Sequence, residues 1–242
     1  MSQLNLYSLR VRRHQPARGK GKSLLVEGIA ENGLEYALKR QAEGLMVPGT
    51  EAICYRLAQA CGIATPAEAM LIDLDGAAVF GSRIEGGLFE TETLEPEARI
   101  QEFQACAGRL SACFALDLLV GNEDRHFGNF LYRRRADGLL AILAIDYNRA
   151  FWLSGWPPAL SSLRQTMTLT GLEMLRALGL WRPVDALTTL GTASTIRVQD
   201  LTDWISALPA QWIPEAQRQQ LLDWWGSPAF FAHVSACTQH CR

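Results

Sequence analysis

A short polar segment interrupts an apolar part of the chain and carries side chains that could act together in catalysis. Asp124, His126 and Asn129 lie within six residues, and Asp146 follows at the end of an apolar stretch. One carboxylate with one amide oxygen suits Mg²⁺, which takes few hard oxygen ligands from a protein and fills its other positions with phosphate and water. The other carboxylate can then accept a hydroxyl proton or orient a nucleophile. The pattern predicts metal-assisted phosphoryl transfer.

A lysine and a glutamate nearer the N-terminus would complete such a site. Lys39 lies late in a predicted strand, and Glu51 lies early in the next predicted helix. A lysine that is held by a glutamate can bind the phosphates of ATP. Such pairs are also common on protein surfaces, so it is their order along the chain, ahead of Asp124, Asn129 and Asp146, that favours a nucleotide site.

A glycine-containing loop precedes this lysine. Residues 18–23 read Arg-Gly-Lys-Gly-Lys-Ser and lie between the first two predicted strands. Gly19 and Gly21 would let backbone amides approach a phosphate closely, and the lysines add positive charge. The segment is not a Walker loop, because no earlier glycine stands at the required spacing. It is expected to contact nucleotide phosphates.

Strands must position the first of these groups. Alternating apolar and polar residues predict strands at residues 4–11, 23–29, 34–40, 67–72 and 77–83. Asn32-Gly33 is the strongest hairpin signal. A helix that opens near Pro48 carries Glu51 and ends at Gly62.

Helices dominate the rest of the chain. After an acidic connector, one long helix is expected from Pro96 to about Val120. A hairpin over residues 130–145 then leads to Asp146. Its second strand is apolar on both sides, which predicts burial on both faces.

The order of these elements predicts an α+β class with a bilobal, protein-kinase-like fold. A small β-rich N-terminal lobe with one helix would cover residues 1–87 and bind ATP. A larger helical C-terminal lobe would cover residues 88–242 and carry the catalytic loop.

The composition is that of an ordinary globular protein. The chain has 242 residues, of which 48% are hydrophobic and 20% charged, and a formal net charge of -2. These values exclude a disordered chain. The longest clean apolar run, residues 139–145, is too short to span a membrane. The near-neutral charge also argues against a nucleic-acid binder. We therefore expect a protein without membrane contact or direct nucleic-acid contact, and we expect it to be cytoplasmic.

Cysteines and tryptophans carry weaker signals. The six cysteines form no Cys-x-x-Cys pair and are expected as reduced thiols in the core. His233, Cys237, His240 and Cys241 near the C-terminus do not have a spacing typical of zinc sites. All seven tryptophans follow residue 150, which favours a helical core and leaves an exposed aromatic docking patch as the alternative.

The polar segment resembles a known family. Residues 121–129, Gly-Asn-Glu-Asp-Arg-His-Phe-Gly-Asn, together with Ile145-Asp146 are similar to the HipA-like kinases, and closest to their compact branch without the extra N-terminal subdomain. The order Asp-Arg-His-x-x-Asn is also similar to the phosphatidylinositol kinases. Residues 79–83, Val-Phe-Gly-Ser-Arg, resemble the strand that leads into the hinge of the compact branch. The resemblance covers about residues 20–155.

The resemblance implies a role for each matching residue. Lys39 would bind the phosphates of ATP. Asp124 would be the base-like catalytic residue, and His126 would support the loop. Asn129 and Asp146 would bind Mg²⁺.

The resemblance also implies an adenine site and partners. Backbone atoms near Gly81, Ser82 and Arg83 would meet adenine. Asn148 stands two residues after Asp146, where the family usually has glycine, and asparagine tolerates the left-handed backbone expected there. A protein substrate, a toxin-type role and an antitoxin-type partner are further implications.

These observations leave alternatives open. The first hypothesis is an ATP- and Mg-dependent Ser/Thr protein kinase of HipA-like type. The second keeps the fold but changes the acceptor to a lipid or a small molecule, as the Asp-Arg-His order suggests. The third is an inactive nucleotide-binding scaffold whose tryptophan-rich helical part binds a partner.

Overall fold

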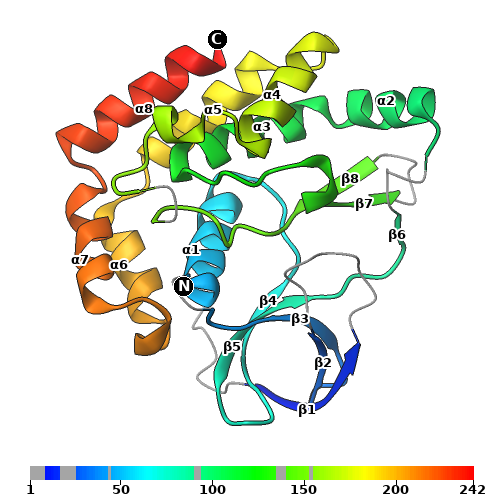
Figure 1. Cartoon of the computed structure of the whole chain (residues 1–242), viewed down its shortest axis with the longest axis vertical. Helices are drawn as coiled ribbons and strands as arrows, with labels where there is room; N and C mark the ends of the chain where they lie inside the picture. The colour runs from blue at the N-terminus through cyan, green and yellow to red at the C-terminus, as the bar shows by residue number, and fades with distance from the viewer. Residues whose placement is uncertain (1–8, 17–25, 43–44, 90–93, 135–139, 153–154) are drawn as a thin grey trace.

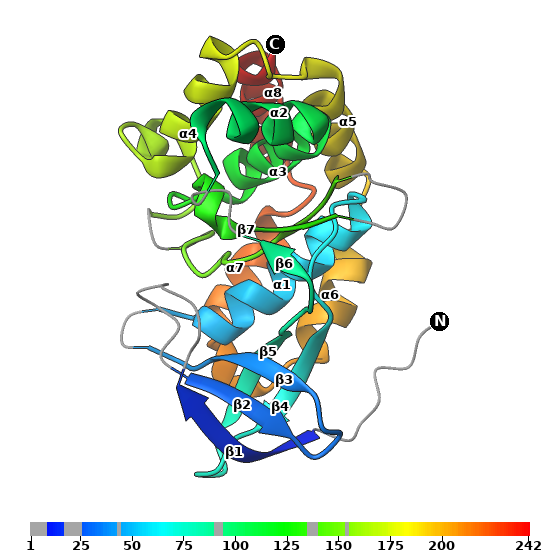
Figure 2. The same cartoon turned by 90° about the vertical axis from the view of Figure 1, so that its right-hand side faces the viewer.

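The computed structural model of the chain describes residues 9–16, 26–42, 45–89, 94–134, 140–152 and 155–242. Strands at one end of the molecule curl into a barrel, and helices gather at the other end, with helix α1 between them (Figures 1 and 2). The mixed helix and strand content that the sequence predicts is confirmed.

The barrel has the strand order β1-β2-β3-β5-β4. Its strands are β1 (Leu9–Pro16), β2 (Val26–Ala30), β3 (Glu35–Lys39), β4 (Glu68–Ile72) and β5 (Ala78–Arg83). Antiparallel ladders join the neighbours along this order. The barrel is closed where β1 pairs in parallel with β4, Leu9 opposite Leu71 and Arg10 opposite Ile72. Because Lys39 is the last residue of β3, the barrel presents it at the end of a strand.

The first strand extends further along the chain than predicted. A strand over residues 4–11 was expected, whereas β1 runs from Leu9 to Pro16, and residues 1–8 lie outside the described residues. The polar residues after Val11 remain extended because their backbone pairs with β2, down to Pro16 opposite Val26. Most of their side chains are exposed on the outside of the barrel, so no apolar alternation marks this part of the strand.

Helix α1 (Val47–Ala60) is packed between the barrel and the C-terminal helices. A Cβ on Gly49 would lie 2.3 Å from the side chain of Ile213 and 2.9 Å from the carbonyl oxygen of Trp212. The indole N–H of Trp212 donates to the carbonyl oxygen of Ala78 at 3.1 Å. The same short segment therefore contacts both α1 and the start of β5.

The single long helix expected up to Val120 is wrong. The segment forms α2 (Pro96–Ala105) and α3 (Ala107–Val120), which are bent by 77° at their junction. The break is Cys106, whose φ of -120° and ψ of 15° leave the helical region. Phe103 and Cys106 are both buried, so the apolar pattern continues across the break and periodicity cannot reveal the bend.

Helix α3 is the centre of the helical part. It is almost wholly buried and packs against α1, α2, α4, α5 and α8. The remaining helices are α4 (Met167–Ala177), α5 (Pro183–Ser194), α6 (Val198–Ser206), α7 (Glu215–Trp224) and α8 (Pro228–Cys241). The tryptophan-rich helical core that the sequence predicts is confirmed for the buried side chains of Trp181, Trp212, Trp224 and Trp225.

A second sheet lies beside α3 and has the order β6-β7-β8. Its strands are β6 (Leu88–Phe89), β7 (Phe130–Arg134) and β8 (Leu140–Ala144). Burial of β8 on both faces was expected, but only alternate residues are buried and Ala141 and Leu143 are partly exposed. The reason is that only one face of β8 is fully covered, and the side chains on its other face remain partly open to solvent. The predicted division after residue 87 falls between β5 of the barrel and β6 of this sheet, and it stays a prediction.

Within the described residues, every cysteine is a free thiol, and all but Cys61 are buried, as expected for core thiols. Among the same residues, no single helix combines the length and the apolar character needed to cross a membrane. Helices α2 and α3 would do so only if they were counted together across their bend.

The packing of α1 gives a prediction about stability. Gly49→Ala should lower the free energy of unfolding by about 1–3 kcal/mol, because the added methyl group overlaps Ile213 and a backbone oxygen. Gly191→Ala is the matched control: its Cβ would meet nothing within 4 Å, so it should stabilise α5 by about 0.5–1 kcal/mol. Urea unfolding of both variants measures this, and equal effects would contradict the packing at Gly49.

Candidate functional site

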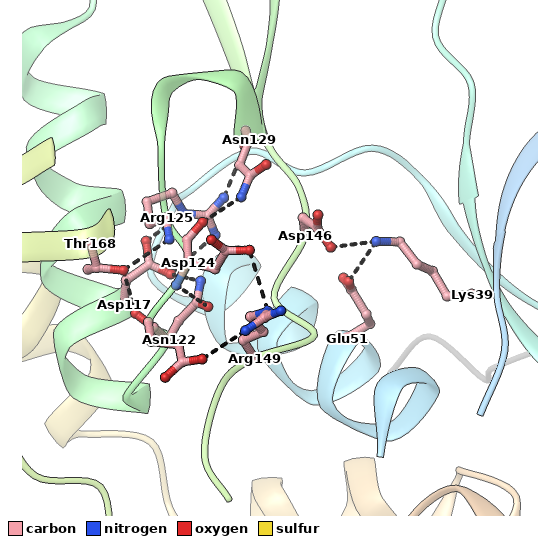
Figure 3. A network of polar contacts seen from close by, with 11 residues as sticks. Lys39, Glu51, Asp117, Asn122, Asp124, Arg125, Asn129, Asp146, Arg149 and Thr168 are labelled. Carbon is pink, nitrogen blue, oxygen red and sulfur yellow. Dashed lines mark hydrogen bonds and ion pairs between the residues drawn. The ribbon is translucent and has the colours of Figure 1, made fainter. Parts of the chain in front are cut away.

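Three elements bring charged side chains together beside α1. Lys39 comes from the end of β3, Glu51 from the second turn of α1, and Asp146 from the residues after β8. The Nζ atom of Lys39 lies 2.6 Å from Oδ1 of Asp146 and 3.2 Å from Oε1 of Glu51 (Figure 3). Residues that are far apart in the sequence thus meet at the ammonium group of Lys39.

The three charges in this group influence one another. Burial opposes the charge on Lys39, but the carboxylates of Glu51 and Asp146 outweigh it, so the pKa of Lys39 is raised. Burial raises the pKa of Glu51, although Lys39 opposes this. Burial would also raise the pKa of Asp146, but attraction to Lys39 outweighs it and lowers the pKa. Asp146 therefore stays ionised at neutral pH, as a metal ligand must.

The backbone turns sharply at Asp146 itself. Its φ is 64°, in the left-handed region, where aspartate is among the better tolerated residues. The sequence placed the left-handed residue at Asn148, and this is wrong, since Asn148 does not have a positive φ. The turn directs the carboxylate of Asp146 away from the line of β8 and toward Lys39 (Figure 3).

The polar loop after α3 closes through two hydrogen bonds. The Nδ2 atom of Asn129 donates to the carbonyl oxygen of Asp124 at 2.8 Å. Nδ1 of His126 accepts from the N–H of Gly128 at 3.1 Å and caps the short 3₁₀ helix Phe127–Asn129. Because the amide nitrogen of Asn129 faces the loop, its oxygen lies on the other side, toward Asp146 (Figure 3).

The loop is joined to the strand that carries Asp146. The N–H of Ile145 donates to the carbonyl oxygen of Asn129 at 3.1 Å. Asn129 is buried, whereas the side chain of Asp124 is 40% exposed. The arrangement thus leaves Asp124 accessible to an acceptor while Asn129 and Asp146 lie deeper.

A buried arginine that sequence reasoning passed over holds this loop. Nε and Nη2 of Arg125 donate to the two carboxylate oxygens of Asp117 in α3, at 2.7 and 3.2 Å. Nη1 donates to the carbonyl oxygen of Asn129 at 2.9 Å and also to that of Ile145. The guanidinium group lies 4.4 Å from the centre of the Tyr147 ring. Arg125 therefore contacts α3, the catalytic loop and the end of β8 at once.

Neighbouring polar groups complete this network. Nδ2 of Asn122 donates to Asp117 at 2.7 Å. The hydroxyl of Thr168 accepts from the N–H of Arg125 at 3.0 Å and donates to the carbonyl oxygen of Asn122 at 2.5 Å. All of these side chains are buried. The signal in the sequence was Asp117, a single carboxylate within the otherwise apolar residues 112–120 of α3, which needs a buried partner.

The residues expected to meet adenine lie inside the barrel sheet. Gly81 is in β5, between β3 and β4, and a Cβ there would lie 2.5 Å from Leu71. The hydroxyl of Ser82 is hydrogen-bonded to that of Tyr55 at 2.9 Å. The N–H of Arg83 donates to the carbonyl oxygen of Ala67 at 2.8 Å. The backbone of all three residues and the side chain of Ser82 are thus engaged in the fold. Gly19 and Gly21 lie outside the described residues.

The oxygen donors near Lys39 fit one kind of metal ion. Among the described residues, no cluster of three or more His, Cys, Asp or Glu side chains could hold a metal, and this includes the C-terminal His and Cys residues. Asp146 and the amide oxygen of Asn129 remain. One carboxylate and one amide oxygen fit Mg²⁺, which keeps water and phosphate ligands, and do not fit a structural zinc.

The buried pair of Arg125 and Asp117 gives a prediction about folding. Arg125→Met should cost about 3–5 kcal/mol of unfolding free energy, because it leaves the Asp117 carboxylate buried without its cation. Asp117→Asn combined with Arg125→Met should cost less than the sum of the single variants. A double-mutant cycle by urea unfolding measures the coupling, and additive effects would show that the two side chains do not interact.

Comparison with known proteins gives a clear result only at the level of structure. No protein-family model matches the chain, and no curated protein matches its sequence. The crystal structure of CtkA, a proinflammatory kinase of Helicobacter pylori, superposes with a TM-score of 0.61 at 13% identity, and the alignment covers 97% of this chain and 98% of CtkA. HipA of Shewanella oneidensis MR-1, solved with HipB and operator DNA, gives a TM-score of 0.47 at 11% identity over 93% of this chain and 61% of HipA.

At these identities a structural likeness speaks for the fold alone, and the likeness to CtkA spans nearly the whole of both chains. The chain therefore has the fold of the kinase CtkA, and the kinase-like fold that its motifs predict is confirmed.

Proposed function

We propose that the protein is an ATP- and Mg-dependent kinase of HipA-like type that phosphorylates serine or threonine hydroxyls of a protein. The observation that carries the proposal is the meeting of Lys39, Glu51 and Asp146 beside the loop of Asp124 and Asn129. A phosphate-binding cation, oxygen ligands for Mg²⁺ and an accessible carboxylate are the groups that phosphoryl transfer requires.

Each side chain has a distinct part in this proposal. Lys39, held by Glu51, binds the phosphates of ATP. Asp146 and the amide oxygen of Asn129 hold Mg²⁺, which when bound offsets the charge of the phosphates. His126 caps the loop and contacts no reacting atom. Arg125 keeps Asn129 and Asp146 in register, because it binds the carbonyl oxygen of Asn129 and that of Ile145, the residue before Asp146.

The transfer itself needs only one proton to move within the protein. The acceptor hydroxyl oxygen forms a bond to the γ-phosphorus, and the bond from that phosphorus to the β,γ-bridging oxygen breaks. The bonding electrons leave with ADP, and the hydroxyl proton passes to the carboxylate of Asp124. The 40% exposure of Asp124 supports this part, since an acceptor has to reach it from solvent.

The adenine site is proposed to lie just past the residues that the sequence indicated. The N–H groups of Arg83 and Ile84 are already bound to Ala67 and Glu35. The backbone of residues 85–87, between β5 and β6, is the next part of the chain. We assign the adenine contacts to this segment.

An antitoxin-type partner and a toxin role rest on the family resemblance alone.

Asp124→Asn tests the catalytic assignment. This variant should lose at least about 100-fold in phosphate transfer, because the amide cannot take up the hydroxyl proton. It should keep ATP binding and stability, since Asp124 is exposed. The assay measures transfer from labelled ATP with Mg²⁺ to one of three acceptors: dephosphorylated casein, a lipid vesicle or small alcohols. The acceptor that is labelled shows whether the protein is a protein kinase, a lipid kinase or a small-molecule kinase. The control is Asp223→Asn on α7, which should stay fully active. Among the described residues, the carboxylate of Asp223 is bonded only to Gln219. ATP binding without transfer to any acceptor would favour the inactive scaffold.

Asp146→Asn tests the metal site. In the wild type, ATP with MgCl₂ should raise the melting temperature more than ATP with EDTA. A ligand at 100 times its dissociation constant adds about 2.7 kcal/mol, which a thermal shift detects. The variant should lose the Mg-dependent part of this shift. An unchanged response to Mg²⁺ would exclude Asp146 as a ligand.

A further inference from the structure

We propose that Arg149 is a further catalytic residue, which contacts the phosphoryl group in transit from the side opposite Lys39. The inference rests on the proposed function. Nε of Arg149 lies 3.4 Å from Oδ2 of Asp124, and Nη1 lies 2.9 Å from Oε1 of Glu123. Figure 3 shows the guanidinium group next to Asp124, with the pair of Lys39 and Asp146 further to the right in this view.

The proposed contact of Arg149 with the phosphoryl group follows from its short distance to Asp124, the proton acceptor. An acceptor hydroxyl that gives its proton to Asp124 lies within hydrogen-bond distance of that carboxylate. The phosphorus atom that it attacks is one bond further away. A guanidinium group that already contacts Asp124 therefore reaches the oxygens of the same phosphoryl group through a rotation of its side chain.

Arg149 is also the cation that is able to move. Of the cationic side chains labelled in Figure 3, Lys39 and Arg125 are 10% and 0% exposed, whereas Arg149 is 45% exposed. Arg125 is committed to Asp117 and to backbone carbonyls. An exposed ion pair such as that of Arg149 is weak, so exchanging a carboxylate for a phosphoryl oxygen costs little.

The backbone around Arg149 is firmly held. Tyr147 and Phe151 on either side are buried, and the N–H of Phe151 donates to the carbonyl oxygen of Val120 at 2.6 Å. The N–H of Ala150 donates to the carbonyl oxygen of Tyr147 at 3.1 Å. The Cα of Arg149 thus stays close to Asp146 and the catalytic loop, and only its side chain needs to turn.

The chemical part of Arg149 is electrostatic. Its planar fork of N–H donors matches the equatorial oxygens of the phosphoryl group, whose charge is shared among them during transfer. Arg149 keeps its proton throughout, while the hydroxyl proton goes to Asp124 and the electron pair of the broken bond goes to ADP. Glu123 serves as the resting partner of the guanidinium group before nucleotide binds.

A transition-state analogue separates this part from ground-state binding. We would measure dissociation constants of Arg149→Met and Arg149→Lys for Mg·ADP with and without aluminium fluoride, which mimics the phosphoryl group in transit. Arg149→Met should bind Mg·ADP within about twofold of wild type but lose about 100-fold or more in the fluoride complex, the size expected for one lost donor. Arg149→Lys should recover part of the loss. Phosphate transfer to an added acceptor should show a lower kcat at unchanged KM for ATP.

The control is Arg197→Met, which removes an exposed arginine paired with Asp200 on α6 and should change none of these values. Two results would overturn the assignment of Arg149 alone: an unchanged affinity for the fluoride complex, or an equal loss for both complexes, which would indicate that Arg149 only braces the loop. A wild-type protein that gains no affinity from aluminium fluoride and turns over no ATP would instead remove the proposed function, and with it this inference.

Discussion

The buried charge of Arg125 is the constraint on which the candidate site depends. A guanidinium group that is wholly removed from water is tolerated only when its donors are matched, and here they meet a carboxylate and two backbone carbonyl oxygens. These acceptors come from α3, from the catalytic loop and from the end of β8. The loop cannot shift relative to the strand without leaving a donor or an acceptor unpaired. The network therefore fixes geometry more than it adds stability.

A second constraint joins this rigid region to the barrel. Lys39 is the last residue of β3, and its ammonium group meets Glu51 on α1 and Asp146 after β8. Three parts of the chain thus share one buried charge. The segment around Trp212 reinforces the arrangement, because it contacts α1 at Gly49 and β5 at Ala78. The position of α1 is consequently set by packing on one side and by charge on the other.

Sequence reasoning predicted the residues that meet, because their types and order are informative. Lys39, Glu51 and Asp146 were identified from a strand, a helix and a hairpin in the right succession, and the structure brings them together. It could not place the break at Cys106, since the apolar pattern continues through it. It also misplaced the left-handed residue, because Asp146 itself adopts the positive φ and Asn148 does not.

What the sequence left out is explained by burial. Arg125 reads as an ordinary charged loop residue, and only its surroundings in three dimensions show that it is enclosed. Gly81 was interpreted as part of a ligand contact, whereas its lack of a side chain makes room for Leu71 inside the barrel. For both Arg125 and Gly81, the role depends on how the residue is packed, which the residue type alone does not indicate.

The closure of the barrel has a consequence for its dynamics. Among the described residues, the seam between β1 and β4 has two residue pairs, Leu9 opposite Leu71 and Arg10 opposite Ile72, whereas every residue of β4 pairs with β5. A short seam opens more easily than a long ladder, so its amides should exchange with solvent hydrogen before those of β5. Opening there would bare two strand edges while leaving Lys39, on the far side of β2, undisturbed.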